Sequence, residues 1–140
     1  FWTKDGTALL IWNGEIYNFQ QLKAGLSYPW QTQSDTEVLL ALMIQKGKQA
    51  LSELEGMFAL ALYDREEQTL LLARDRFGKT PLYIHQNETS FSFASEVRVL
   101  MRMHPYLNRV SAEQVSNWLF WQTDFIRRVK RHQRKKLKRK

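Results

Sequence analysis

Apolar and polar positions near the N-terminus predict a pair of short strands. Two β-prone runs, 8–12 and 16–17, flank the dipeptide Asn13-Gly14. An Asn-Gly pair in this setting is typical of a two-residue type I′ turn, which requires positive φ at both central positions. The pattern therefore predicts a β-hairpin that turns at Asn13 and Gly14.

Two or three helices are expected next. Asn18 can cap a short helix that runs to about Leu26, and the segment 34–37, Ser-Asp-Thr-Glu, has the spacing of a capping box. After the capping box, apolar residues recur at helical spacing, at Val38, Leu39, Leu42 and Met43. Gly47 is placed to end this helix, and a second short helix is expected at 48–54.

Beyond Gly56 the pattern changes to that of strands. The expected strands cover residues 57–63 and 69–73, joined by a polar turn, and then 81–84 and 89–93. Ser95 is placed to cap a helix to about Met103, and Ser111 one from Ala112 to Trp121. Strand pairs covered by helices predict an α+β layered domain.

Composition narrows the class of protein. The 140 residues are about one domain, and a hydrophobic share of 44% is ordinary for a packed core. There is no cysteine, which excludes disulfides, thiolate zinc sites and a cysteine nucleophile within these residues. No apolar stretch reaches membrane-spanning length, so we expect a cytoplasmic protein with no membrane partner.

The net charge of +7 is concentrated in the last residues. Residues 124–140 carry ten Lys or Arg and one acid, whereas the preceding 123 residues hold 11 basic and 13 acidic side chains. We therefore divide the chain into a slightly acidic domain, 1–123, and a basic tail, 124–140, which we expect to be disordered or weakly helical. Such a tail could bind phosphates, but it carries no motif, and an unrelated terminal extension is the favoured interpretation.

Several residues could carry chemistry. An Asn13 side-chain amide beside the Gly14 N–H could bind an oxyanion, although for an isolated Asn-Gly pair a turn alone is the strongly favoured interpretation. Residues 74–76, Arg-Asp-Arg, could form a phosphate-binding cluster, but ion pairing that pins the loop is the favoured interpretation. Three histidines lack the spacing of a metal site and are expected to be solvated or hydrogen-bonded: His85, His104 and His132.

Five segments, read together and in order, resemble the glutamine amidotransferase domain of glutamine-hydrolysing asparagine synthetase. They are Asn-Gly-Glu-Ile-Tyr-Asn at 13–18, Ser-Asp-Thr-Glu at 34–37, Leu-Glu-Gly-Met-Phe-Ala at 54–59, Ala-Arg-Asp-Arg-Phe-Gly at 73–78 with Pro-Leu-Tyr at 81–83, and Phe-Ala-Ser-Glu at 93–96. Each segment alone is a weak signal, but the ordered set is specific, and the resemblance extends from about Thr7 to Trp121.

The resemblance implies roles for four residues. The Asn13 side-chain amide and the Gly14 backbone N–H match the oxyanion hole of the family, and Glu15 and Asp35 match the positions that hold the α-ammonium group of glutamine. Taken alone, Glu15 would be a solvated strand residue, and Asp35 would support the first helical turn through the helix dipole. No metal ligand is implied in this part of the chain.

The resemblance also implies a fold and an incomplete site. The family has an N-terminal-nucleophile hydrolase-like αββα sandwich of two antiparallel sheets, which residues 1–123 would form in part. Its nucleophile is an N-terminal cysteine, and an arginine in an upstream segment holds the glutamine carboxylate. Since neither segment is present, we interpret the chain as an internal fragment that is inactive by itself.

For the parent protein the resemblance implies an asparagine synthase, in which ammonia from glutamine amidates aspartate in a second domain. That synthetase domain would require ATP and magnesium, whereas no cofactor is expected in residues 1–140. The expected partners are glutamine and the synthetase domain, with a homodimer as one option and nucleic acid disfavoured. Two alternatives stay open: a class II amidotransferase with another ammonia acceptor, and a non-catalytic basic binding module.

Overall fold

A computed structural model describes residues 1–108, Ala112, 115–116, Leu119 and 132–136, the last five by their backbone only. Within it the chain divides into two compact units, residues 1–81 with 131–140, and residues 82–130. The first unit carries all four residues of the expected site.

A four-stranded antiparallel sheet forms the frame of the first unit. Its strands are β1 (Ala8–Ile16), β2 (Gly56–Asp64), β3 (Thr69–Arg74) and β6 (His132–Lys136), in the order β1-β2-β3-β6. Strand β2 pairs with β1 on one side and with β3 on the other. The β2–β3 pair confirms the hairpin predicted for strands 57–63 and 69–73. Strand β1 lies at the edge of this sheet.

The hairpin turn expected at Asn13 and Gly14 is wrong. Both residues lie inside the continuous strand β1, where Asn13 is opposite Ala59 and Gly14 is opposite Phe58. Gly14 has φ of 141°, and a Cβ at this position would overlap the carbonyl oxygen of Met57 on the neighbouring strand. The glycine is therefore required by the close approach of β2 and not by a chain reversal.

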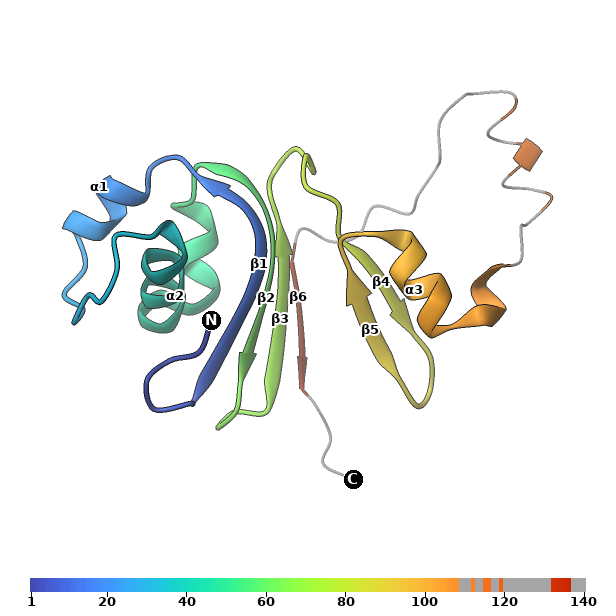
Figure 1. The fold of residues 1–140 in the computed structure, drawn as a ribbon, viewed down its shortest axis with the longest axis horizontal. Helices are drawn as coiled ribbons and strands as arrows, with labels where there is room; N and C mark the ends of the chain where they lie inside the picture. The colour runs from blue at the N-terminus through green and yellow to red at the C-terminus, as the bar shows by residue number, and fades with distance from the viewer. Residues whose placement is uncertain (109–111, 113–114, 117–118, 120–131, 137–140) are drawn as a thin grey trace. The chain divides into compact units, whose positions relative to one another are not determined.

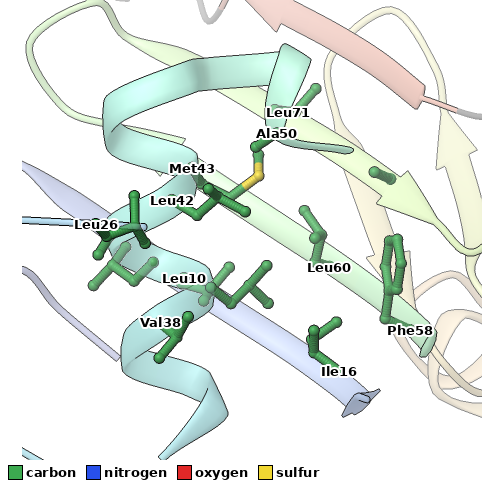
Figure 2. Packing of buried hydrophobic residues seen from close by; sticks show 14 residues of the cluster. Leu10, Ile16, Leu26, Val38, Leu42, Met43, Ala50, Phe58, Leu60 and Leu71 are labelled. Atoms are coloured by element: carbon green, nitrogen blue, oxygen red, sulfur yellow. The ribbon is translucent and has the colours of Figure 1, made fainter. Parts of the chain in front are cut away.

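Helices cover one face of this sheet (Figure 1). They are α1 (Phe19–Ala24), α2 (Asp35–Lys46) and the 3₁₀ helix η1 (Gly47–Ser52). Figure 2 shows how apolar side chains of α2 meet those of β1 and β2 in the main core. The labelled members of this core are Leu10, Ile16, Leu26, Val38, Leu42, Met43, Ala50, Phe58, Leu60 and Leu71.

The start of α2 confirms one half of the expected capping box and corrects the other. Ser34 is the N-cap, and its Oγ accepts a hydrogen bond from the Thr36 N–H at 3.0 Å. Glu37 does not return to the cap, because its carboxylate is bonded to the N–H groups of Gln31 and Thr32 instead. Gly47 ends the helix as expected.

Caps predicted for two other helices are absent. Asn18 precedes α1 without a side-chain cap, because its amide donates to the Glu53 carbonyl and accepts from the Glu55 N–H. The residue preceding α3 (Val97–Met103) is Glu96 rather than Ser95, and it also makes no cap hydrogen bond.

The second unit contains a two-stranded antiparallel sheet of β4 (Tyr83–Gln86) and β5 (Phe91–Ala94), which confirms the predicted strand pair. Helix α3 and the 3₁₀ helix η2 (Pro105–Asn108) follow. The helix expected from Ala112 to Trp121 falls mainly outside the described residues.

Part of the basic tail differs from the expected disordered or weakly helical chain. Residues His132–Lys136 form strand β6, which pairs with β3 and places Arg134 opposite Leu71. The rest of segment 124–140 lies outside the described residues, so the domain boundary at 123 stays a prediction.

Candidate glutamine site

Three of the four predicted site residues lie together near the end of β1. Asn13 and Glu15 are exposed, whereas Trp12 and Ile16 on either side of them face the core. This alternation is the normal period of a strand with one buried face. The predicted site therefore starts from a strand that the core holds at Trp12 and Ile16.

Hydrogen bonds at both ends of the β1–β2 pair fix which backbone groups the pairing uses. The Arg65 N–H donates to the Thr7 carbonyl at 2.8 Å, and the Tyr17 N–H donates to the Glu55 carbonyl at 2.7 Å. In an antiparallel pair, hydrogen-bonded and non-hydrogen-bonded positions alternate. The odd-numbered residues of β1 are therefore the bonded ones, and Gly14 occupies a non-bonded position.

The partner of Gly14 supports this assignment. The backbone N–H and carbonyl of Phe58 point away from β1. The carbonyl accepts a hydrogen bond from the Asp75 N–H at 2.8 Å, and the N–H donates to the Asp75 carboxylate at 3.4 Å. Because a strand residue points both backbone groups the same way, the Gly14 N–H is directed away from β2. It lies on the outer side of β1, where residues 1–3 pair with the strand only at Ala8–Leu10 among the described residues.

Asp35 is the first residue of α2 and is half-buried. A hydrogen bond between the residues next to the two motifs links this helix start to β1: Trp12 Nε1–H donates to Thr36 Oγ1 at 3.1 Å. The bond links residues that are 24 positions apart and adjacent to the two motifs. Asn13 and Glu15 lie on the face of β1 opposite to Trp12, and no hydrogen bond joins Asp35 to either of them among the described residues.

The segment that leads into α2 is held by Glu37, of which only 1% is exposed. Its carboxylate accepts hydrogen bonds from the N–H groups of Gln31 and Thr32 and from the Thr32 hydroxyl, at 2.7–3.2 Å. Burial raises the pKa of Glu37, but these donors and the nearby Lys23 charge outweigh it and lower the pKa overall. The carboxylate stays ionised and fixes the chain just before Asp35.

A second buried carboxylate organises the loop after β3. Asp75 accepts backbone hydrogen bonds from Phe77, Lys79 and Thr80 at 3.0 Å each, in addition to the one from Phe58. Burial raises the pKa of Asp75, and the backbone donors lower it by more. The expectation that ion pairs pin this loop is wrong, because the loop is held by backbone N–H groups.

Arg74 also serves this loop, through a hydrogen bond from Nη2 to the Gly78 carbonyl at 2.6 Å. Its Nε is buried, and no hydrogen-bond partner among the described residues reaches it. A groove of about 640 Å³ lies beside this loop and includes Gly56, Met57 and Phe58 on β2. These residues are opposite Ile16, Glu15 and Gly14 on β1, but none of the four predicted site residues lines the groove.

Two of the three histidines expected to be solvated or hydrogen-bonded, His85 and His104, lie together in the second unit, whereas His132 lies on β6 and is described by its backbone only. His85 Nε2 lies 2.6 Å from Tyr106 Oη, and His104 Nε2 lies 2.8 Å from Ser92 Oγ. The described residues contain no group of three or more His, Cys, Asp or Glu side chains that could hold a metal ion. Within the same part of the chain, no helix is long and apolar enough to span a membrane.

Sequence reasoning missed Trp12, Thr36 and the actual role of Glu37. The available signal was position alone, because Trp12 precedes Asn13 and Thr36 follows Asp35. Neither the indole-to-hydroxyl bond nor the return of Glu37 to residues 31 and 32 could be read from spacing.

The outward N–H of Gly14 and the exposed amide of Asn13 are donors of the kind that bind an oxyanion. The match to a known family identifies the class: a glutamine amidotransferase. The family described as "Glutamine amidotransferase domain" matches residues 1–138, and the chain belongs to it. Asparagine synthetase B [glutamine-hydrolyzing] of Escherichia coli K12 is 42% identical over 124 residues, which cover 86% of this chain and 22% of that protein. Asparagine synthetase [glutamine-hydrolyzing] 1 of Bacillus subtilis is 43% identical over 101 residues, covering 70% of this chain and 16% of that protein.

The chain therefore spans about a fifth of the length of these curated relatives. Among solved structures, the glutamine phosphoribosylpyrophosphate amidotransferase from B. subtilis, complexed with ADP and GMP, matches with a TM-score of 0.60 and 30% identity. That match covers 71% of this chain and 24% of the other. The expected family and the α+β, N-terminal-nucleophile hydrolase-like fold class are confirmed.

Proposed function

We propose that residues 13–15 and Asp35 form the glutamine-binding part of a glutaminase site. In this proposal the Asn13 amide and the Gly14 N–H bind the oxyanion, and Glu15 and Asp35 bind the α-ammonium group. A cysteine from a segment outside residues 1–140 completes the site, since these residues contain no cysteine. By themselves, residues 1–140 would not hydrolyse glutamine.

The chemistry explains why these groups are needed. A cysteine thiolate attacks the side-chain amide carbon of glutamine, and the carbonyl oxygen becomes negative in the tetrahedral intermediate. Two donors aimed at that oxygen lower the barrier to this step. The proton that the thiol gave up is transferred to the amide nitrogen, the C–N bond breaks, and ammonia leaves. Water then hydrolyses the thioester, which gives glutamate and restores the thiol.

The observation that carries the proposal is the outward N–H of Gly14. The register of β1 on β2 directs this donor away from β2, on the outer edge of β1 beyond the part that residues 1–3 cover, and next to an exposed amide side chain. A strand that used this N–H in its ladder would have no backbone donor to offer at this position.

Two carboxylates suit the other end of the substrate. An ammonium group has three N–H donors, and charge-assisted hydrogen bonds to carboxylates are about twice as strong as neutral ones. The bond between Trp12 and Thr36 ties the start of α2, and so Asp35, to the strand that carries Glu15.

For the whole protein we propose an asparagine synthase (glutamine-hydrolysing), because the curated relatives carry that name. Its partner would be a synthetase domain that uses ATP and magnesium to amidate aspartate, and its location the cytoplasm. This proposal is compatible with a homodimer and assigns no role to nucleic acid.

The test uses the chain extended at its N-terminus by a segment that supplies the cysteine. We expect this protein to release ammonia from glutamine, and Asn13→Ala to lower kcat by about 10²–10³. Asn108→Ala, an exposed asparagine at the end of η2, is the matched control and should retain full activity. Unchanged kcat in the correctly folded Asn13 variant would remove Asn13 from the oxyanion hole.

A different ammonia acceptor is the second candidate, favoured by the match to the phosphoribosylpyrophosphate amidotransferase at a TM-score of 0.60. The parent protein decides between the two. Glutamine-dependent conversion of aspartate to asparagine with ATP supports the first, and ammonia transfer to another acceptor supports the second.

A further inference from the structure

One side-chain hydrogen bond connects the two motifs that the proposed site needs. Trp12 Nε1–H on β1 donates to Thr36 Oγ1 on α2 at 3.1 Å, in a partly buried position. Among the residues that the structure describes, no other side-chain hydrogen bond joins this strand to this helix. Trp12 immediately precedes Asn13, and Thr36 immediately follows Asp35.

Both ends of this bond are held by other contacts. Trp12 packs against the main hydrophobic core, and the Thr36 N–H donates to the Ser34 cap at 3.0 Å. Before the helix, Glu37 fixes Thr32 and Lys23 donates to the carbonyl of the same residue at 3.1 Å. The bond therefore joins two already ordered elements, so it can fix their relative position.

The residues of α2 and β1 that form the main core are apolar. Leu10, Ile16 and Val38 belong to the same apolar cluster, which Figure 2 shows between the strands and the helix. Apolar contacts stabilise the packing but have little directional preference, whereas a hydrogen bond weakens steeply away from its preferred angle. The indole-to-hydroxyl bond is the contact best suited to set where the start of α2 lies along β1.

We propose that Trp12 and Thr36 are positioning residues, which hold Asp35 at the distance from Asn13 and Gly14 that matches the length of glutamine. This inference rests on the proposed function, because it assigns to Asp35 the α-ammonium of the substrate. It adds that recognition of the ammonium depends on a bond between two residues that touch no substrate.

Two conservative variants remove the bond and leave most of the packing. Trp12→Phe keeps an aromatic ring but lacks the N–H donor, and Thr36→Val has nearly the same shape but lacks the oxygen acceptor. Each is made in the cysteine-extended chain and assayed with glutamine and with glutaramate, the analogue that lacks the α-ammonium group.

We expect each variant to raise KM for glutamine by about 3–10-fold, the range typical of one lost hydrogen bond, with kcat nearly unchanged. KM for glutaramate should not change, because that substrate has no ammonium for Asp35 to bind. The double variant should be no worse than either single variant, since both remove the same bond. Trp2→Phe, the same substitution at an exposed tryptophan, is the control and should leave both KM values unchanged.

An equal rise in KM for both substrates, an unchanged KM for glutamine, or additive effects in the double variant would overturn the proposal. Asp35→Asn, measured alongside, separates this failure from that of the proposed function. If Asp35→Asn raises KM for glutamine and Trp12→Phe does not, only the positioning role fails. If Asp35→Asn has no effect, the ammonium site itself is wrong.

Discussion

Gly14 meets two independent constraints that few residues could satisfy. Its φ of 141° is a conformation that residues with a Cβ rarely adopt, and a Cβ would in addition overlap the Met57 carbonyl. Its own N–H faces away from β2. The close approach of β2 requires the absence of a side chain at Gly14, whereas the register of the two strands directs its N–H outward.

Gly14→Ala should therefore lower the free energy of unfolding by roughly 2–4 kcal/mol, since it combines backbone strain with a clash against a neighbouring main chain. Gly6→Ala is the matched control, because Gly6 also has positive φ, of 68°, but a Cβ there meets nothing within 4 Å. Urea denaturation of both variants measures the difference. Equal losses of about 1 kcal/mol would show that strain alone matters at Gly14 and that β2 does not crowd it.

At the scale of single elements, the sequence predicted what depends on local signals. The apolar stripe of α2 and its Ser34 cap were predicted, and so were strands β2 and β3. The Asn13-Gly14 signal was misread because a turn and a close approach between strands both require glycine. The role of Glu37 was predicted wrongly because a glutamate three residues after Ser34 fits a capping box. Its carboxylate instead accepts hydrogen bonds from the N–H groups of residues 31 and 32.

Glu37 makes the stability of α2 depend on pH. Its pKa is lowered in the folded protein, so its contribution is fully present above the unfolded value of about 4.3 and is lost as pH falls through the lower folded value. Glu37→Gln should cost about 1.5–3 kcal/mol at pH 7 and reduce the loss of stability on acidification below pH 4.

Denaturant unfolding between pH 3 and 7 measures this effect. Asp75 has a lowered pKa of the same kind, so part of the acid dependence should persist in the Glu37 variant. Glu66→Gln, at an exposed glutamate, is the control and should follow the parent curve. If the Glu37 and Glu66 variants have the same pH profile, the buried carboxylate does not stabilise the fold.

At the scale of the whole chain, the arrangement of the sheet depends on pairings between distant residues. Spacing predicted the β2–β3 pair because a short turn joins the two strands. It could not predict that β1 pairs with β2 across the helices, or that β6 pairs with β3 across more than 50 residues. The resemblance to a known family, and not the periodicity, therefore carried the prediction of the site.

Strand β6 covers an edge that would otherwise be open. β3 is buried along most of its length and apolar, with residues Leu70–Ala73 at its centre, so its uncovered edge would favour pairing with other chains. Deleting residues 124–140 should increase self-association, measured by light scattering at several concentrations. A truncation after Lys136 keeps β6 and should behave as the parent; equal association of both truncated proteins would show that β6 does not protect this edge.

The position of the substrate ammonium tests the central claim most directly. A crystal structure of the cysteine-extended chain, with its cysteine alkylated by a diazoketone analogue of glutamine, locates that group. We predict that the analogue's ammonium nitrogen lies within about 3.2 Å of the Asp35 carboxylate and its carbonyl oxygen within the same distance of the Gly14 nitrogen. An ammonium group bound elsewhere, with Asp35 turned away from it, would contradict the site described here.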